Sequence, residues 1–260
     1  MKLLANIVLS TLTLGLSLAW SAEGGELPRT GLHTVEFTPQ ELLGDQGAID
    51  AAEILHDNDN ISWQIYVPDS YDAALPAGAV VYVSPQSKGG PPTMWKRALH
   101  DKNLIWIGAR NAGNRVAVNK RMFLAMLAPR VLARDYVLDT ERIYVAGFSG
   151  GGKTASRVSS AKPDIFRGGI YIAGAEMWGS NTPPPKLDLI RQNRHVFLTG
   201  SNDFNEMLTR RVYTAYKHAG VENSELIVVR RLGHELPDRK TFIRAVDYLD
   251  SRITGSNLAE

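Results

Sequence analysis

Short runs of apolar residues alternate with helix-like patterns along most of this chain, and that alternation restricts the fold more than any other feature. Residues 79–83 and 104–107 are continuous apolar runs without a charge. The same pattern returns in residues 143–146, 169–173, 196–199 and 226–229. Uninterrupted apolar strands are typical of parallel sheets that are buried on both faces. The sequence therefore predicts an α/β fold with a mostly parallel central sheet and helices on both of its faces.

Other segments complete the predicted order of elements. Apolar residues recur at helical spacing in residues 117–134. Further helices are expected at residues 151–161, 206–219 and 239–252. Residues 33–37 and 51–56 are short, weak strand candidates, and residues 61–67 alternate apolar and polar side chains like a half-buried strand. No internal repeat or linker divides the chain, and only about 22 residues separate the strand that ends at 173 from the one that begins at 196. We therefore expect a single domain, residues 23–260, with little or no lid.

The first 22 residues have the pattern of a secretory signal peptide. Lys2 supplies a positive start, residues 3–18 carry no charge and are mostly apolar, and small residues at 19–22 suit cleavage. The alternative is an uncleaved membrane anchor, but polar residues interrupt a stretch that is already short for a span. We therefore expect an exported protein, periplasmic or extracellular, without stable membrane association after cleavage. The absence of cysteine suits a bacterial periplasm better than a eukaryotic secretory route.

Composition excludes several classes of function. The 29 basic and 27 acidic residues nearly cancel, so no electrostatic argument supports nucleic acid or an anionic membrane as a main partner. The chain has no cysteine, which excludes disulfides, thiolate metal sites and a cysteine nucleophile. Its six histidines show no paired spacing typical of a metal site. We expect no metal and no cofactor.

One glycine-rich segment fits two motifs at once. Residues 147–151, Gly-Phe-Ser-Gly-Gly, match G-x-S-x-G, in which a sharp turn between a strand and a helix exposes the hydroxyl of Ser149. Residues 147–154 also match G-x-x-x-x-G-K-[ST], in which backbone N–H groups and Lys153 bind phosphate. Both motifs lie between a strand and a helix, so the local context does not separate a nucleophile from a nucleotide site.

The rest of the chain favours the nucleophile. A serine nucleophile needs a histidine base and a carboxylate that orients it. Asp203 follows the strand at 196–199 and His234 follows the strand at 226–229, in the order serine, acid, histidine. Glu176, after the strand that ends at 173, is the rival acid. A phosphate-binding loop usually follows an early strand, whereas Ser149 follows roughly the fourth or fifth.

The loops at residues 147–151, 200–205 and 233–237 resemble the nucleophile, acid and histidine loops of the α/β-hydrolase superfamily. Over residues 61–252 the chain looks most like small exported esterases of the polyhydroxybutyrate-depolymerase and feruloyl-esterase kind. The resemblance implies an α/β-hydrolase fold and hydrolysis of carboxylic esters, small or polymeric. It also implies a catalytic triad, composed of Ser149, Asp203 and His234.

The chain departs from that family after the third main strand. Residues 84–90, Ser-Pro-Gln-Ser-Lys-Gly-Gly, stand where such enzymes commonly have His-Gly and a small residue. Pro85 has no N–H to donate. We therefore expect the oxyanion hole, the pair of donors that stabilises the tetrahedral intermediate, to consist of the N–H groups of Gln86 and Gly150.

Two other functions remain open on the same residues. A serine peptidase or amidase would use the same triad, and a noncatalytic hydrolase-like binding protein would fit the missing His-Gly motif. Further polar or aromatic candidates for substrate contact are Asn111, Asn114, Arg115 and Trp178. Each of them also has an ordinary structural explanation, in a solvated turn or in the core.

Overall fold

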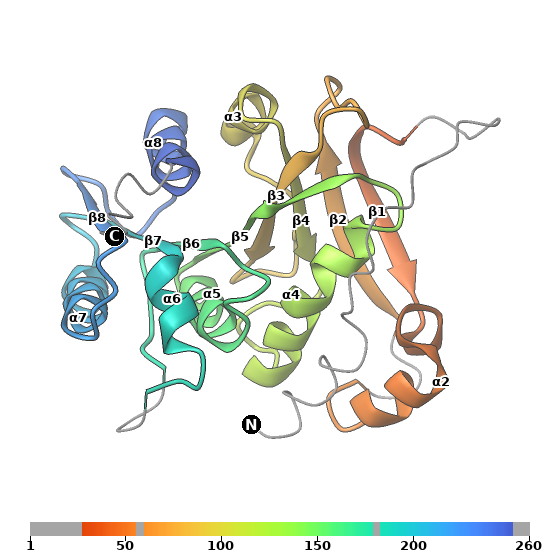
Figure 1. The fold of residues 1–260 in the computed structure, drawn as a ribbon. Helices are drawn as coiled ribbons and strands as arrows, with labels where there is room; N and C mark the ends of the chain where they lie inside the picture. Colours follow the sequence, from red (N-terminus) through yellow and green to blue (C-terminus); the bar gives the residue numbers. More distant parts are fainter. Residues whose placement is uncertain (1–27, 56–59, 179–182, 252–260) are drawn as a thin grey trace, which may run out of the picture.

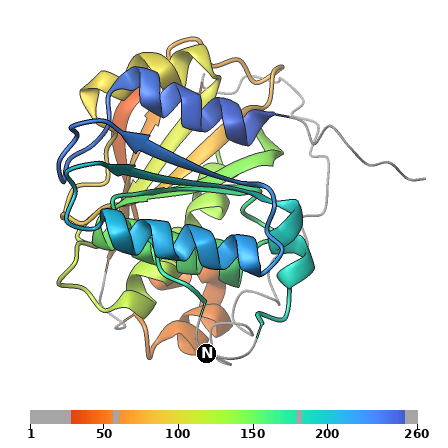
Figure 2. The same ribbon diagram turned by 90° about the vertical axis from the view of Figure 1, so that its left-hand side faces the viewer.

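The computed structural model describes residues 28–55, 60–178 and 183–251 (Figure 1). The signal peptide predicted for residues 1–22 lies outside the described residues, so it stays a prediction. The described residues form a central sheet with helices on both faces (Figures 1 and 2).

The sheet has eight strands in the described part of the chain, in the order β1-β2-β4-β3-β5-β6-β7-β8. Their bounds are β1 Gly31–Phe37, β2 Ile61–Val67, β3 Ala77–Val83, β4 Leu104–Ala109, β5 Leu138–Phe148, β6 Gly168–Ile172, β7 Arg194–Gly200 and β8 Ser224–Val229. The pairs β1–β2 and β2–β4 are antiparallel, and all strands from β4 to β8 pair in parallel. The prediction of a mostly parallel sheet is confirmed.

Helices cover both faces because side chains alternate across each strand. The helices are α2 Pro39–Ala51, α3 Lys96–Asp101, α4 Val118–Leu132, α5 Gly150–Ala161, α6 Leu187–Gln192, α7 Glu206–His218 and α8 Arg239–Asp250. Phe197 of β7 packs in a core cluster that includes residues of α4, α5 and α7. Its neighbour Val196 packs in the opposite cluster, with residues of α3 and α8. Figure 2 shows α7 and α8 on opposite sides of the sheet.

The strand predicted at residues 51–56 is wrong. Residue 51 ends helix α2 and residues 52–55 form a turn, while residue 56 lies outside the described ranges. Thr38 and Glu41 start the helix with a reciprocal capping box, and Pro39 occupies its first turn. Gly44 then takes a left-handed φ of 74° inside the helix, which breaks the apolar periodicity. The six-residue helices α3 and α6 are also absent from the predicted set.

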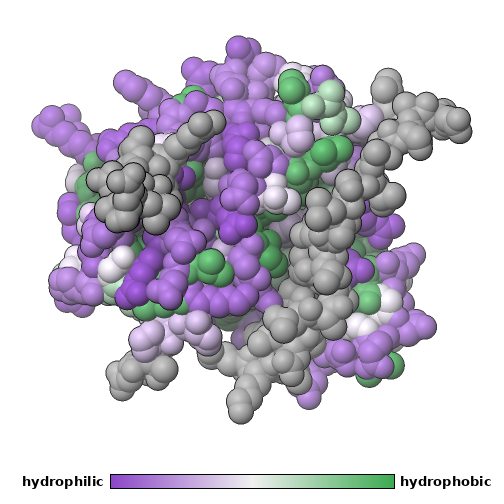
Figure 3. All heavy atoms as spheres, viewed as in Figure 1, coloured by the Kyte–Doolittle hydropathy of each residue, from purple (hydrophilic) through white to green (hydrophobic). Residues whose placement is uncertain are grey.

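Apolar residues are mostly enclosed between the layers. On the face seen in Figure 3, hydrophilic residues predominate and hydrophobic ones form small separate groups. Among the residues that the structure describes, no helix is both long enough and apolar enough to cross a membrane.

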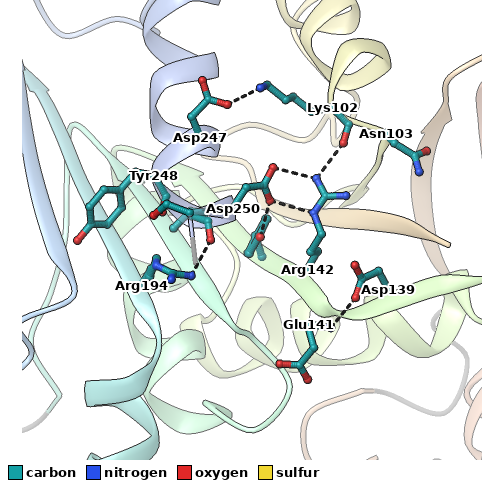
Figure 4. Close-up of polar contacts among 12 residues, drawn as sticks. Lys102, Asn103, Asp139, Glu141, Arg142, Arg194, Asp247, Tyr248 and Asp250 are labelled. Carbon is teal, nitrogen blue, oxygen red and sulfur yellow. Dashed lines mark hydrogen bonds and ion pairs between the residues drawn. The ribbon is translucent and has the colours of Figure 1, made fainter. Parts of the chain in front are cut away.

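A polar cluster joins the layers at the amino ends of the central strands (Figure 4). Asp250 of α8 accepts hydrogen bonds from Nε and Nη2 of Arg142, both at 2.9 Å, and from the hydroxyl of Tyr144 at 2.7 Å. Arg142 also donates to the carbonyl of Lys102, and Lys102 pairs with Asp247. These contacts tie α8 and the end of α3 to β5. The opposite edge, at the carboxyl ends of the parallel strands, carries the candidate site.

Candidate active site

Ser149 occupies a strained turn between β5 and α5. Its φ of 56° and ψ of −121° lie in a region that residues other than glycine rarely adopt. The turn is held from both sides, because the N–H of Ser149 donates to the carbonyl of Ile172 at 2.8 Å and the N–H of Lys153 donates to the carbonyl of Ser149 at 3.1 Å. The half-buried serine hydroxyl is therefore fixed at the amino end of α5.

Close packing accounts for the glycines around Ser149. A Cβ on Gly151 would lie 1.9 Å from the carbonyl oxygen of Val83, and one on Gly152 would lie 2.2 Å from that of Gly174. The hydroxyl of Thr154 donates to the carbonyl of Gly150, within its own helix. These close backbone contacts alone explain why glycines stand at positions 151 and 152. A phosphate-binding role is not needed to account for them.

The structure brings the three predicted triad residues into one hydrogen-bonded line. Nε2 of His234 lies 2.9 Å from Oγ of Ser149, and Nδ1 of His234 lies 2.9 Å from Oδ1 of Asp203. A carboxylate only accepts hydrogen bonds, so Nδ1 carries the proton. In the neutral imidazole, Nε2 is then the acceptor that faces the serine hydroxyl. This is the geometry in which a histidine can remove the serine proton.

Asp203 is held in place by its own loop. Its side chain is fully buried, and Oδ1 also accepts from the N–H of Asn205 at 2.8 Å. The rival acid Glu176 instead pairs with Arg157. The geometry therefore favours Asp203 over Glu176 as the acid.

Two aromatic rings, which the sequence analysis did not single out, contact the imidazole. The centroids of Phe148 and Phe204 lie 4.9 Å and 4.1 Å from that of His234. Phe204 is 78% exposed, so it presents an apolar surface beside the candidate base. Both phenylalanines are sequence neighbours of predicted triad residues, Ser149 and Asp203, and that adjacency is the one signal that could have found them.

The two N–H groups predicted for the oxyanion hole have different surroundings. The N–H of Gln86 donates to the hydroxyl of Ser84 at 3.0 Å, so it already has a partner. The bond joins a serine hydroxyl to the backbone N–H two residues further along the chain, which is a local turn that serine favours. The N–H of Gly150 opens helix α5 directly after Ser149. The N–H of Gly150 thus lies next to the candidate nucleophile, whereas the N–H of Gln86 is engaged by Ser84.

The loop that carries Gln86 is tied to the loop after β4. The N–H of Asn114 donates to the carbonyl of Pro85 at 3.0 Å, and that of Asn111 donates to the carbonyl of Ser87 at 2.7 Å. The side chain of Asn114 lies against Gly150, because a Cβ on that glycine would be 2.3 Å from Oδ1 of Asn114. Asn114 is therefore at the site, whereas Asn111 serves the loop through its backbone.

The other two candidates for substrate contact lie differently. Arg115 is exposed on the loop after β4. The ring of Trp178 packs against Tyr216 of α7, with centroids 4.6 Å apart, and joins the core cluster on that side of the sheet. The structure therefore gives Trp178 a packing role.

Comparisons with known proteins find similarity in structure but not in sequence. No family model and no curated protein sequence matches the chain. A mutant feruloyl esterase module from Clostridium thermocellum, complexed with sinapinate, has a TM-score of 0.60 at 16% identity over 87% of this chain and 95% of its own. S-formylglutathione hydrolase from Staphylococcus aureus has a TM-score of 0.58 at 11% identity over 86% of this chain and 99% of its own.

A peptidase is also similar in structure. A protein assigned as a dipeptidyl aminopeptidase IV, from Bacteroides ovatus, has a TM-score of 0.59 at 16% identity and covers 86% of this chain. The chain spans only 36% of that protein's length. The strand order and the mostly parallel sheet match the fold of these structural neighbours. The chain therefore has the α/β-hydrolase fold.

Proposed function

We propose that this chain is an exported serine hydrolase that cleaves carboxylic esters through an acyl-enzyme on Ser149. One observation carries the proposal: the continuous hydrogen-bonded line from Ser149 through His234 to the buried Asp203, with both distances at 2.9 Å. Export is supported by the charge and apolar pattern of residues 1–22.

The reaction follows from the positions of the protons. Nε2 of His234 takes the proton of the Ser149 hydroxyl as Oγ bonds to the ester carbonyl carbon, and the carbonyl oxygen becomes an oxyanion. Asp203 stabilises the imidazolium. The carbon–oxygen bond to the alcohol then breaks, and His234 returns its proton to the departing oxygen. Water, deprotonated by the same imidazole, attacks the acyl carbon. The bond to Oγ then breaks, His234 returns the proton to Ser149, and the acid leaves.

The N–H of Gly150 is the first donor available to the oxyanion, because it follows Ser149 at the positive end of α5. The N–H of Gln86 becomes a second donor when it exchanges the Ser84 hydroxyl for the substrate oxygen. Exposed Phe204 supplies apolar contact beside His234. This surface suits an ester with an apolar group, either soluble or part of a polymer.

Amide hydrolysis is the second candidate function. The similarity to the dipeptidyl aminopeptidase IV from Bacteroides ovatus favours it, because that protein is assigned as a peptidase and shares the fold. Comparison of p-nitrophenyl esters with p-nitroanilide peptides separates the two, and the proposal predicts faster turnover of the esters.

Covalent labelling tests the proposal itself. A fluorophosphonate reacts with an activated serine, so the protein is expected to become labelled while the folded Ser149→Ala variant does not. Absence of labelling and of ester turnover in the folded protein would instead support a noncatalytic binding protein.

A further inference from the structure

Arg121 of α4 is a buried cation directly beneath the candidate site. Only 4% of the residue is exposed. Its Nε donates to the carbonyl of Ala112 at 3.0 Å, its Nη2 donates to the carbonyl of Ser84 at 3.1 Å, and its Nη1 lies 3.5 Å from the carbonyl oxygen of Gly150. In the part of the chain that the structure describes, its hydrogen-bond partners are carbonyl oxygens and not a carboxylate.

These three carbonyls belong to the three segments that build the oxyanion site. Ser84 begins the loop after β3 that carries Gln86, and its hydroxyl accepts a hydrogen bond from the N–H of Gln86. Ala112 lies in the loop after β4, which places Asn114 against Gly150. Gly150 follows the candidate nucleophile. One planar guanidinium therefore sets the separation of the loops after β3, β4 and β5.

A buried arginine without a carboxylate partner lowers the stability of the fold, so stability alone does not explain this arrangement. Burial without a charged partner disfavours the cation and lowers the pKa of Arg121. A small cavity beside it has mainly apolar walls, including Trp63, Val81 and Ala125. An apolar side chain could fill such a space without a buried charge. A positive charge in a water-excluded region stabilises an oxyanion that forms nearby.

We infer that Arg121 is a positioning residue for the oxyanion, holding the Ser84 and Gly150 peptides so that their neighbouring N–H groups meet the tetrahedral oxygen. The inference rests on the proposed serine-hydrolase function. It predicts a contribution to the transition state and little contribution to the binding of ground-state substrate.

The test uses Arg121→Met, Arg121→Lys and Arg121→Ala, with Arg130→Met as the matched control in the same helix. For a p-nitrophenyl ester, we expect kcat of Arg121→Met to fall about 10²-fold with KM changed less than about threefold, as for loss of an oxyanion donor. Arg121→Lys should recover part of kcat, and methylguanidinium should partly rescue Arg121→Ala. Arg130→Met should keep the kcat of the unmodified protein.

A second readout separates positioning from general damage. A trifluoromethyl ketone forms a tetrahedral adduct with the serine, and its affinity should fall in proportion to kcat/KM, while the affinity for the product acid should stay constant. A folded Arg121→Met variant that keeps kcat within about threefold, or that loses both affinities equally, overturns the inference. If Arg121→Met does not fold, Arg121→Ala decides by the same criteria. Failure of the unmodified protein to turn over ester would instead refute the proposed function before any Arg121 variant is compared.

Discussion

Nε2 of His234 lies 2.9 Å from Oγ of Ser149, although 85 positions separate the two residues in the chain. Three features create this contact: the strained turn after β5, the loop after β8 and the buried carboxylate of Asp203 after β7. Because parallel strands end at one edge of the sheet, loops distant in sequence meet there.

Asp203→Asn should fold normally and lose about 10⁴-fold in kcat, because an amide favours the wrong imidazole tautomer. Glu176→Gln is the matched control, since Glu176 pairs with Arg157 and not with His234. Steady-state kinetics on one ester compare both variants with the unmodified protein. If Glu176→Gln loses the activity and Asp203→Asn keeps it, the acid has been assigned to the wrong residue.

Ser84→Ala should raise kcat by up to about fivefold at unchanged KM. The hydroxyl of Ser84 holds the N–H of Gln86, and a competing hydrogen bond of about 1 kcal/mol must break before that N–H can reach an oxyanion. Kinetics with short-chain esters measure the effect. A tenfold loss would contradict this account and would show that the Ser84 hydroxyl assists the reaction.

Phe204→Ala should lower kcat/KM for esters with aromatic or long acyl groups by about threefold to tenfold and leave acetate esters nearly unchanged. Phe204 is 78% exposed and its ring centroid lies 4.1 Å from that of His234, so an apolar substrate group beside the imidazole gains contact with it. Met207→Ala, on the neighbouring exposed turn of α7, is the control for loss of apolar surface. Equal losses for acetate and bulky esters would argue that Phe204 acts on His234 alone.

Stability should fall as the pH drops from about 6.5 to about 4. Burial lowers the pKa of His195 to about 4, while its neutral ring accepts from Tyr171 and bonds the carbonyl of Ile190. In that window the unfolded chain binds a proton that the folded protein excludes, so the free energy of unfolding decreases by about 3 kcal/mol. Urea unfolding at several pH values measures the decrease.

His195→Gln is the control for that pH dependence. The variant should be less stable at pH 7 but should show a smaller decrease toward pH 4. The difference between the two proteins isolates His195 from other groups, such as His33, whose pKa burial also lowers. An identical decrease in both proteins would exclude His195 as the cause.

The sequence predicts the central sheet well because its strands are buried on both faces. Residues 79–83 and 104–107 carry no charge, and both lie within observed strands. Helix α2 carries a start signal in its sequence, the capping box of Thr38 and Glu41, but Gly44 breaks the apolar periodicity that would mark the rest as a helix. Apolar patterning therefore suffices where burial is uniform, and fails where one glycine interrupts a helix.

At the candidate site, sequence predicts the residues that occur in a motif but not their environment. Ser149, Asp203 and His234 each follow a strand, so their meeting could be expected from topology. The engaged N–H of Gln86 could not, because it depends on which way the Ser84 hydroxyl points. Arg121 also gave no signal, since its role depends on three carbonyls that meet only in the folded chain.

The most direct test of the central claim is the rate of fluorophosphonate labelling, measured by mass spectrometry on the folded protein beside Ser149→Ala and His234→Ala. The account predicts one adduct on Ser149, no adduct in Ser149→Ala, and labelling slowed by at least about 10³-fold in His234→Ala, because the unassisted hydroxyl is a weak nucleophile. Labelling at another residue, or an equal rate in His234→Ala, would contradict it.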